Sequence, residues 1–294
     1  MCESNSAPYN ALWAGARRRD IVFRRAAIGG YLIGATAFVA AVATGHFGVG
    51  WDAGSYWNAA TGHPYEAVEG VRGAFVYSPP IAQLLTLLRP LGPNGIAALV
   101  AALSLASLLY VAGPWAVLFL LVPQVEIELL MGNINLILGA AIVLGFRHPG
   151  AWALVLLTKV TPGVGLLWFV VRSDGRSLAR ALVPTIAIVL MSFAVAPGWW
   201  RAWAGVLLDS AKATPLNMSI GIPLLPRVSI AALLAVWGGA TFRPQTVVVA
   251  AWLALPVLWG QTEAMLIACL PLIGPWGVVF TGLPRVSRGQ GQES

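Results

Sequence analysis

The sequence contains little charge, only two lysines and only two cysteines. Charged residues make up 10% of its 294 residues, whereas a soluble domain carries about 25%. The hydrophobic fraction is 58% and the mean hydropathy is +0.78. This composition excludes a soluble domain with one anchor, and it indicates an all-α integral membrane protein with several spans.

The charges that are present argue against nucleic-acid binding. The net charge is +7, but the basic residues are almost all arginines that cluster at the ends of apolar segments. Such clusters fit lipid headgroups and the positive-inside rule. We therefore expect membrane lipids as partners and no nucleic acid.

Patterns for metal and nucleotide chemistry are missing as well. Cys2 and Cys269 lie near opposite ends of the chain, which speaks against a disulfide framework or a thiolate metal site. The sequence has no Asp-x-Asp pair, no phosphate-binding loop and no dinucleotide fingerprint, and its three histidines show no metal-binding spacing. We expect no metal ion and no other cofactor.

Apolar segments follow one another through most of the chain. A transmembrane helix needs about 20 mostly apolar residues. We expect a cytoplasmic basic tail over 1–25, then an uncleaved first helix, within one integral domain that covers 1–294. The pattern predicts about ten spans, some of them short, broken or re-entrant, at 26–45, 77–93, 94–113, 114–124, 125–146, 149–171, 181–200, 221–238, 245–259 and 264–282.

Two outer loops follow from this topology, at 46–78 and 198–222, and a polar tail covers 283–294. Asp52 lies in the first loop, shortly after an apolar helix and beside Trp51, Tyr56 and Trp57. A carboxylate in this setting suits a general base, or a contact to a sugar hydroxyl while the rings stack on the sugar. An ordinary solvated loop residue is the alternative.

Lys159 interrupts the apolar stretch 149–171, together with Thr161 and Pro162. Arginines flank both ends of the stretch, so we expect a helical hairpin or two half-helices with Lys159 near the tip. An ammonium at membrane depth costs about 2.5–3.5 kcal/mol, and Lys159 should therefore face a cavity or an anion such as a lipid phosphate. Snorkelling to the membrane surface is the alternative.

Glu126 and Glu128 precede two amides, Asn133 and Asn135. The two acids do not share a helical face, and they either flank a loop or line a cavity. Buried amides form hydrogen bonds across helices, so packing is the default interpretation of Asn133 and Asn135.

Four segments, taken in order, resemble the polyprenol-phosphate-mannose-dependent mannosyltransferases of glycosyltransferase family 87. The first resembles that family's opening signature and contains Asp52, Tyr56, Gly62-His63-Pro64-Tyr65 and Phe75-Val76-Tyr77-Ser78-Pro79-Pro80. The others are "MGNINLILGAAIVLGF", "LLTKVTPGVGLLWFVV" and "NMSIGIPLLPR". The chain departs from the family pattern in its short C-terminal half and in having no histidine after His148.

The resemblance implies a GT-C type glycosyltransferase of the cell membrane, with a cytoplasmic N-terminus and an active site on the outer face. It would transfer a hexose, mannose first of all, with inversion from a polyprenyl-phosphate donor to a lipid or glycan acceptor. Asp52 would be the catalytic base, and Lys159 and Arg227 would bind the donor phosphate. The residues expected to contact substrate are Tyr56, Trp57, Tyr65, Tyr77, Asn133, Asn135 and Asn217.

Two other functions stay open. Broken helices that carry a lysine at membrane depth also suit a transporter or flippase of lipid-linked substrates. The short C-terminal half is compatible with a catalytically silent member of the same fold.

Overall fold

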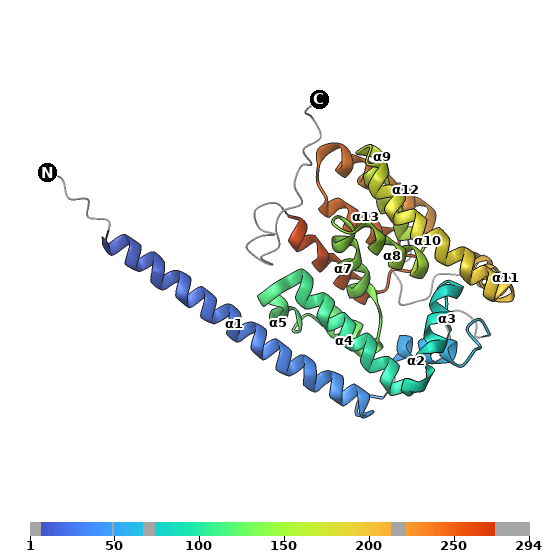
Figure 1. Ribbon diagram of the computed structural model, residues 1–294, viewed down its shortest axis with the longest axis horizontal. Helices are drawn as coiled ribbons and strands as arrows, with labels where there is room; N and C mark the ends of the chain where they lie inside the picture. Colours follow the sequence, from blue (N-terminus) through green and yellow to red (C-terminus); the bar gives the residue numbers. More distant parts are fainter. Residues whose placement is uncertain (1–6, 49, 67–73, 213–221, 274–294) are drawn as a thin grey trace.

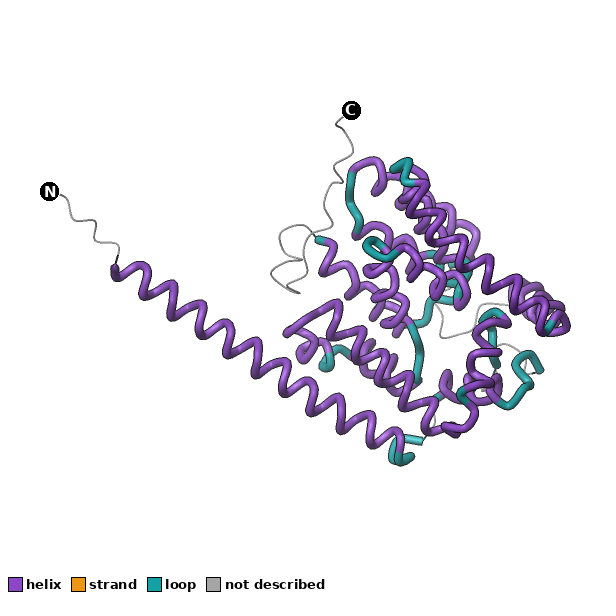
Figure 2. Tube along the Cα trace, in the orientation of Figure 1, coloured by secondary structure: helices purple, strands orange, loops and turns teal. Residues whose placement is uncertain are grey.

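The fold is helical throughout the part of the chain that the structure describes. The computed structural model describes residues 7–48, 50–66, 74–212 and 222–273, and within these ranges it contains helices and loops but no strand (Figure 2). The α-helices are α1 (Ala7–Ala43), α2 (Trp51–Ala60), α3 (Pro79–Leu87), α4 (Gly92–Ala112), α5 (Ala116–Phe119), α6 (Pro123–Met131), α7 (Asn135–Gly145), α8 (Trp152–Thr158), α9 (Leu167–Val171), α10 (Gly175–Val195), α11 (Pro197–Lys212), α12 (Leu224–Thr241) and α13 (Gln245–Leu253). The 3-10 helices are η1 (Arg89–Leu91), η2 (Gly113–Trp115), η3 (Pro149–Ala151), η4 (Thr161–Leu166) and η5 (Gly260–Leu272).

Proline and glycine divide the apolar sequence into these short helices. The first turns of α3, α4 and α6 contain prolines, Pro79, Pro93 and Pro123. A backbone N–H there would have no partner within the helix, so its absence in proline costs no hydrogen bond. Gly113 and Gly132 end helices with φ values of +57° and +72°, in a region that glycine enters at little cost. A continuous apolar stretch therefore becomes several helices that run in different directions.

Four helical stretches are long and apolar enough to cross a membrane: Ile21–Ala43, Arg89–Phe119, Gly175–Val195 and Leu224–Thr241. The pair α6 and α7 makes a fifth if it is counted as one span, although its two helices meet at 103°. The prediction of an all-helical membrane protein with broken helices is confirmed. The predicted count of about ten spans is not confirmed, because stretches such as 149–171 consist of short helices.

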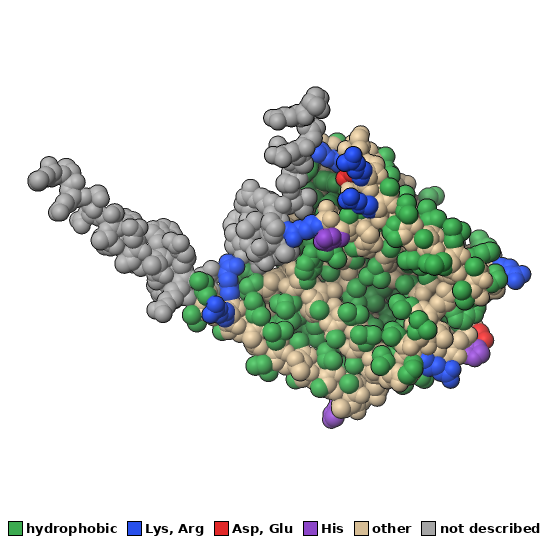
Figure 3. Space-filling view, in the orientation of Figure 1, with side chains coloured by type: hydrophobic (Ala, Val, Ile, Leu, Met, Phe, Trp, Pro, Cys, Tyr) green, Lys and Arg blue, Asp and Glu red, His purple; other side chains and the backbone are tan. Residues whose placement is uncertain are grey.

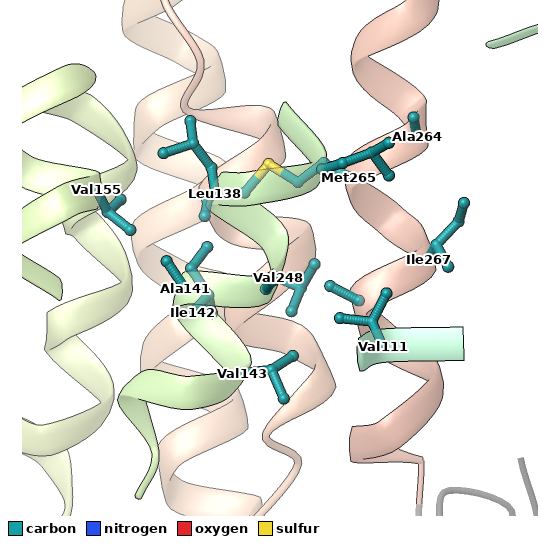
Figure 4. Packing of buried hydrophobic residues seen from close by; sticks show 14 of the residues in the cluster. Val111, Leu138, Ala141, Ile142, Val143, Val155, Val248, Ala264, Met265 and Ile267 are labelled. Carbon is teal, nitrogen blue, oxygen red and sulfur yellow. The ribbon is translucent and has the colours of Figure 1, made fainter. Parts of the chain in front are cut away.

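The core lies between α4, α7, α13 and η5. In Figure 1, α1 runs beside α4 over its second half and extends away from the other helices over its first half. Figure 4 shows Leu138 and Ile142 of α7 beside Val248 of α13 and Met265 of η5, all of them fully buried. These helices form the rigid frame that holds the polar residues described below.

Large apolar side chains remain exposed along the long helices. On α10, Val183, Ile186, Leu190 and Met191 are each more than half exposed, at 64%, 53%, 64% and 62%. Hydrophobic atoms cover much of the middle of the molecule in Figure 3, while arginine and lysine side chains lie near its edges. This pattern is expected of a surface that faces lipid.

Basic residues gather at one end of the helical body. The rings of Phe23 and Trp115 lie 6.0 Å apart, which places the nearby Arg24 at the C-terminal end of α4. Arg147, just after α7, acts electrostatically on Tyr110 in the last turn of α4. Arg24, in the first turn of the candidate span Ile21–Ala43, and Arg147, just after α7, therefore lie toward the same end.

The helix α2 lies at the opposite end. Gly45, just after α1, approaches Asn94 at the start of α4, because a Cβ placed on Gly45 would lie 3.0 Å from the Asn94 side-chain nitrogen. Since α2 follows directly and contacts α4, Asp52 is separated from the basic end by the length of α4.

Candidate active site

Two helix breaks meet at the centre of the candidate site. The first separates α6 from α7, where Gly132 adopts a left-handed conformation and the Asn133 N–H donates to the Glu128 carbonyl at 3.0 Å, in the pattern of a Schellman cap. The second separates α8 from η4, where Lys159 is extended. The sequence-based prediction of a break at Lys159 is confirmed, whereas the apolar stretch 125–146 turns out to be two helices. Irregular backbone at membrane depth is tolerated where it lines a cavity or is buried in protein.

Two glycines let α2 approach the first break. A Cβ on Gly50 would lie 2.3 Å from the Leu130 carbonyl oxygen, and a Cβ on Gly132 would lie 2.9 Å from the Cβ of Ala53. Both distances are too short for a larger residue. Glycine at 50 and 132 thus brings the first turn of α2, and Asp52 with it, against the end of α6.

A network of amides joins Asp52 to Lys159. Asn133 Nδ2 donates to Asp52 Oδ2 at 2.9 Å, and Asn133 Oδ1 accepts from Asn135 Nδ2 at 3.1 Å. Asn135 Oδ1 in turn accepts from Lys159 Nζ at 2.8 Å. Four predicted site residues from α2, the first break, α7 and the second break are therefore in one hydrogen-bonded group.

Glu128, for which the sequence left a loop position and a cavity position open, completes the network. Its side chain is fully buried, and its two oxygens accept from the Asn135 backbone N–H at 2.5 Å and from Asn135 Nδ2 at 3.1 Å. The sequence does contain a weak signal, since an acid seven residues before an amide spans a glycine at which the chain can fold back. Glu126 is exposed by contrast.

The charges around Asp52 act in opposite directions. Burial raises the pKa of the Asp52 carboxyl, while the Lys159 ammonium and the hydrogen bond from Asn133 lower it. Asp52 also lies in the first turn of α2, where the helix dipole favours a negative charge. The result is a half-buried carboxylate whose pKa lies above that of a solvated aspartate, as suits a general base.

The predicted aromatic residues line the same end. The hydroxyls of Tyr56 and Tyr77 are 3.3 Å apart, and their rings stack at 5.9 Å. Burial raises the pKa of both hydroxyls, and the nearby Asp52 raises it further, so both stay neutral. Tyr65 donates to the Tyr77 carbonyl at 2.8 Å, and Trp57 is half-buried against the same cluster.

The segment that carries Tyr77 is fixed on two sides. Ser78 donates through its hydroxyl to the Leu157 carbonyl, two residues before Lys159. Trp203 of α11 donates to the Val76 carbonyl at 3.0 Å. These bonds hold Tyr77 between the end of α8 and α11.

Arg227 lies outside this network. Its guanidinium is buried in the first turn of α12 and donates to the carbonyls of Ile222, Leu253, Leu255 and Pro256 at 2.8–2.9 Å. Four of its five N–H donors are therefore engaged, and they tie the start of α12 to the end of α13. Asn217 lies outside the described residues.

No group of three or more histidine, cysteine, aspartate or glutamate residues suited to a metal ion occurs within the described ranges. The Lys159 ammonium acts electrostatically on both carboxylates, Asp52 and Glu128. Lysine thus supplies the positive charge in this part of the site.

Comparison with known proteins identifies the family. The model of glycosyltransferase family 87 matches residues 75–275, more than half of the chain. The chain belongs to glycosyltransferase family 87. It is therefore a membrane glycosyltransferase, with a sugar donor and an acceptor as substrates. No curated protein and no solved structure matches the chain.

The family 87 match covers most of the site but not α2. It includes Glu128, Asn133, Asn135 and Lys159, whereas Asp52 precedes the matched residues. The place of Asp52 in the site therefore rests on its hydrogen bond to Asn133 and on its electrostatic interaction with Lys159.

Proposed function

We propose that the protein transfers a hexose, with mannose as the expected sugar, from a polyprenyl-phosphate donor to a hydroxyl of a lipid or glycan acceptor. The acceptor oxygen bonds to the anomeric carbon as the bond from that carbon to the phosphate oxygen breaks. Asp52 takes the hydroxyl proton, and polyprenyl phosphate leaves with the electron pair. Attack opposite the leaving group inverts the anomeric configuration. A GT-C type architecture is part of this proposal.

The observation that carries the proposal is the amide bridge between Asp52 and Lys159. A transfer from a phosphate needs a base for the incoming hydroxyl and a positive charge for the leaving group. Asn133 and Asn135 hold these two charges close together without letting them neutralise each other through a direct salt bridge. The proposal includes Tyr56 and Tyr77 as sugar contacts; both side chains are buried, and their neutral hydroxyls lie 3.3 Å apart.

Lys159 is the stronger of the two candidates for the donor phosphate. Its ammonium makes one hydrogen bond among the described residues, to Asn135, and keeps two N–H groups for an anion. Arg227 has one N–H left beyond the four that bind carbonyls. We therefore assign the phosphate to Lys159 first, with Arg227 as a second contact.

The distribution of arginines supports an active site on the outer face of the cell membrane. Arginines gather at the end of the body opposite α2, and the positive-inside rule assigns such an end to the cytoplasm. The N-terminus then lies in the cytoplasm and Asp52 near the outer surface, where a lipid-linked donor presents its phosphate.

A transfer assay tests the proposal. Purified protein is reconstituted in vesicles with a membrane-lipid extract and radiolabelled polyprenyl-phosphate mannose, polyprenyl-phosphate glucose or GDP-mannose. We expect label in a new product from polyprenyl-phosphate mannose alone, at the same rate with a chelator present. Transfer only from GDP-mannose would refute the donor, and a chelator-sensitive rate would refute metal independence.

The same assay separates the other two functions. Movement of the labelled lipid across the bilayer without a new product would indicate a flippase. Neither movement nor product, with several extracts, would indicate a catalytically silent member of the family.

A further inference from the structure

Glu128 is buried where a neutral side chain would be expected. It lies on α6, in the bent pair that counts as one candidate span, and it has no exposed surface. Burying a carboxylate at membrane depth is costly and marks functional positions. Its oxygens do cap the first N–H of α7, but a neutral acceptor such as serine or asparagine caps a helix without that cost.

Glu128 and Lys159 together determine which way the Asn135 amide faces. An ionised carboxylate only accepts hydrogen bonds and an ammonium only donates them. Because Asn135 lies between the two, its nitrogen must face Glu128 and its oxygen must face Lys159, as observed at 3.1 Å and 2.8 Å.

The same orientation continues to Asp52. Asn135 Nδ2 also donates to Asn133 Oδ1, which leaves Asn133 Nδ2 to donate to Asp52 at 2.9 Å. The orientation of Asn135 thus follows from an acceptor at Glu128 and a donor at Lys159, and that of Asn133 follows from Asn135 together with the Ile134 backbone N–H, which donates to Asn133 Oδ1 at 2.7 Å.

We propose that Glu128 is a positioning residue for sugar transfer, whose buried carboxylate orients Asn135 and Asn133 so that Lys159 faces the donor phosphate and Asp52 the acceptor hydroxyl. The inference rests on the proposed function, since it takes Lys159 and Asp52 as the groups that are positioned. Glu128 itself touches neither substrate.

The test compares Glu128→Gln with Glu126→Gln. The two acids lie on the same helix, but the Glu126 side chain is exposed. Glutamine at 128 can accept one of the two Asn135 hydrogens and must turn its own N–H₂ group toward the other. If the glutamine oxygen keeps the Asn135 backbone N–H, the Asn135 amide has to rotate and present a donor to the Lys159 ammonium. If the oxygen keeps Asn135 Nδ2 instead, the first N–H of α7 loses its acceptor.

We expect Glu128→Gln to lower kcat/KM for transfer about hundredfold, with KM for the donor raised and kcat reduced. Glu126→Gln should stay within about threefold of the wild type. A purely structural loss would lower the amount of active protein and leave the donor KM unchanged. Both variants are therefore compared per folded protein, measured by size exclusion and thermal unfolding.

A charge exchange supplies the second arm. In Glu128→Gln/Asn135→Asp, the new carboxylate at 135 accepts from Lys159 and from the glutamine, while the glutamine oxygen still accepts the backbone N–H of residue 135. We expect the donor KM to return most of the way to the wild-type value. The kcat should stay low, since a carboxylate at 135 cannot donate to Asn133.

The outcomes separate this inference from the proposed function. An active wild type with Glu128→Gln equal to Glu126→Gln would overturn the positioning role while leaving transfer intact. A double variant whose donor KM stays as high as that of Glu128→Gln would overturn it too. Absence of transfer by the wild type, or full transfer by Asp52→Asn, would instead refute the proposed function.

Discussion

The hydrogen bond from Asn133 to Asp52 predicts how the rate depends on pH. The hydrogen bond from Asn133 favours the ionised form of Asp52 and lowers the Asp52 pKa. The substitution Asn133→Ala removes this hydrogen bond. Its loss therefore raises that pKa further. Because a base acts only when deprotonated, the acidic limb of the pH–rate profile should move to higher pH.

The size of the effect follows from the bond. A hydrogen bond to a charged group contributes about 1.5–3 kcal/mol, and each 1.4 kcal/mol is roughly tenfold in an equilibrium. The Asn133 bond is the smallest of the three effects on the Asp52 pKa, after burial and Lys159, so we take the lower end. At pH values below the limb the rate should fall about tenfold, and on the alkaline plateau it should change only a few-fold.

The assay is kcat/KM for transfer across pH, which reports the ionisation of the free enzyme. Ser104→Ala is the matched control, because Ser104 donates to the Asn133 backbone carbonyl at 3.3 Å and does not bond Asp52. An acidic limb that stays in place, or moves to lower pH, in Asn133→Ala would refute the assignment of Asp52 as the titrating base.

Three further substitutions test how the site is held. Gly132→Ala should lower the free energy of unfolding by about 2–4 kcal/mol, because of left-handed backbone strain and the clash with α2. It should also reduce transfer, because Asp52 moves. Arg227→Lys should lower stability by about 2–3 kcal/mol, because a lysine cannot bond four carbonyls at once. Lys159→Met should raise the donor KM at least about tenfold and lower kcat, since the phosphate loses its cation.

Each of these has a control and a contradicting result. Gly54→Ala, on α2 where an added Cβ would meet no atom within 4 Å, should not destabilise the protein. A Gly132→Ala variant as stable as the wild type would disprove the close contact at Gly132. The control Arg89→Lys, at an exposed arginine, should be as stable as the wild type. If Arg227→Lys is as stable as the wild type too, Arg227 does not anchor α12. An unchanged donor KM in Lys159→Met would remove Lys159 from the phosphate site.

The sequence predicted most of the residues that meet at the site, because their chemistry is unusual for their surroundings. Lys159 interrupts an apolar stretch, and Asp52 follows a membrane helix beside aromatic rings. The sequence could not show that Asn133 and Asn135 join them, because this depends on a 103° bend between two helices. Hydropathy alone treats residues 125–146 as one apolar segment.

The sequence left the position of Glu128 open, between a loop and a cavity, for the same physical reason. On a continuous helix Glu128 and Asn135 would share a face but lie about 10 Å apart along the axis, whereas the left-handed Gly132 turns the chain back so that the two side chains meet. The predicted span count is not confirmed for a related reason, since hydropathy records apolar length while glycine and proline decide where a helix ends. Arg227 was predicted to bind phosphate from a motif, but a motif cannot show that backbone carbonyls already occupy the N–H donors of the guanidinium.

The most direct test of the account is sugar transfer by Asp52→Asn, because asparagine keeps the shape of the side chain and removes the base. We predict a loss of at least about hundredfold in kcat at every pH, with the donor KM nearly unchanged and the thermal unfolding curve close to that of the wild type. Transfer by Asp52→Asn at the wild-type rate would contradict the assignment of Asp52 as the base and with it the proposed mechanism.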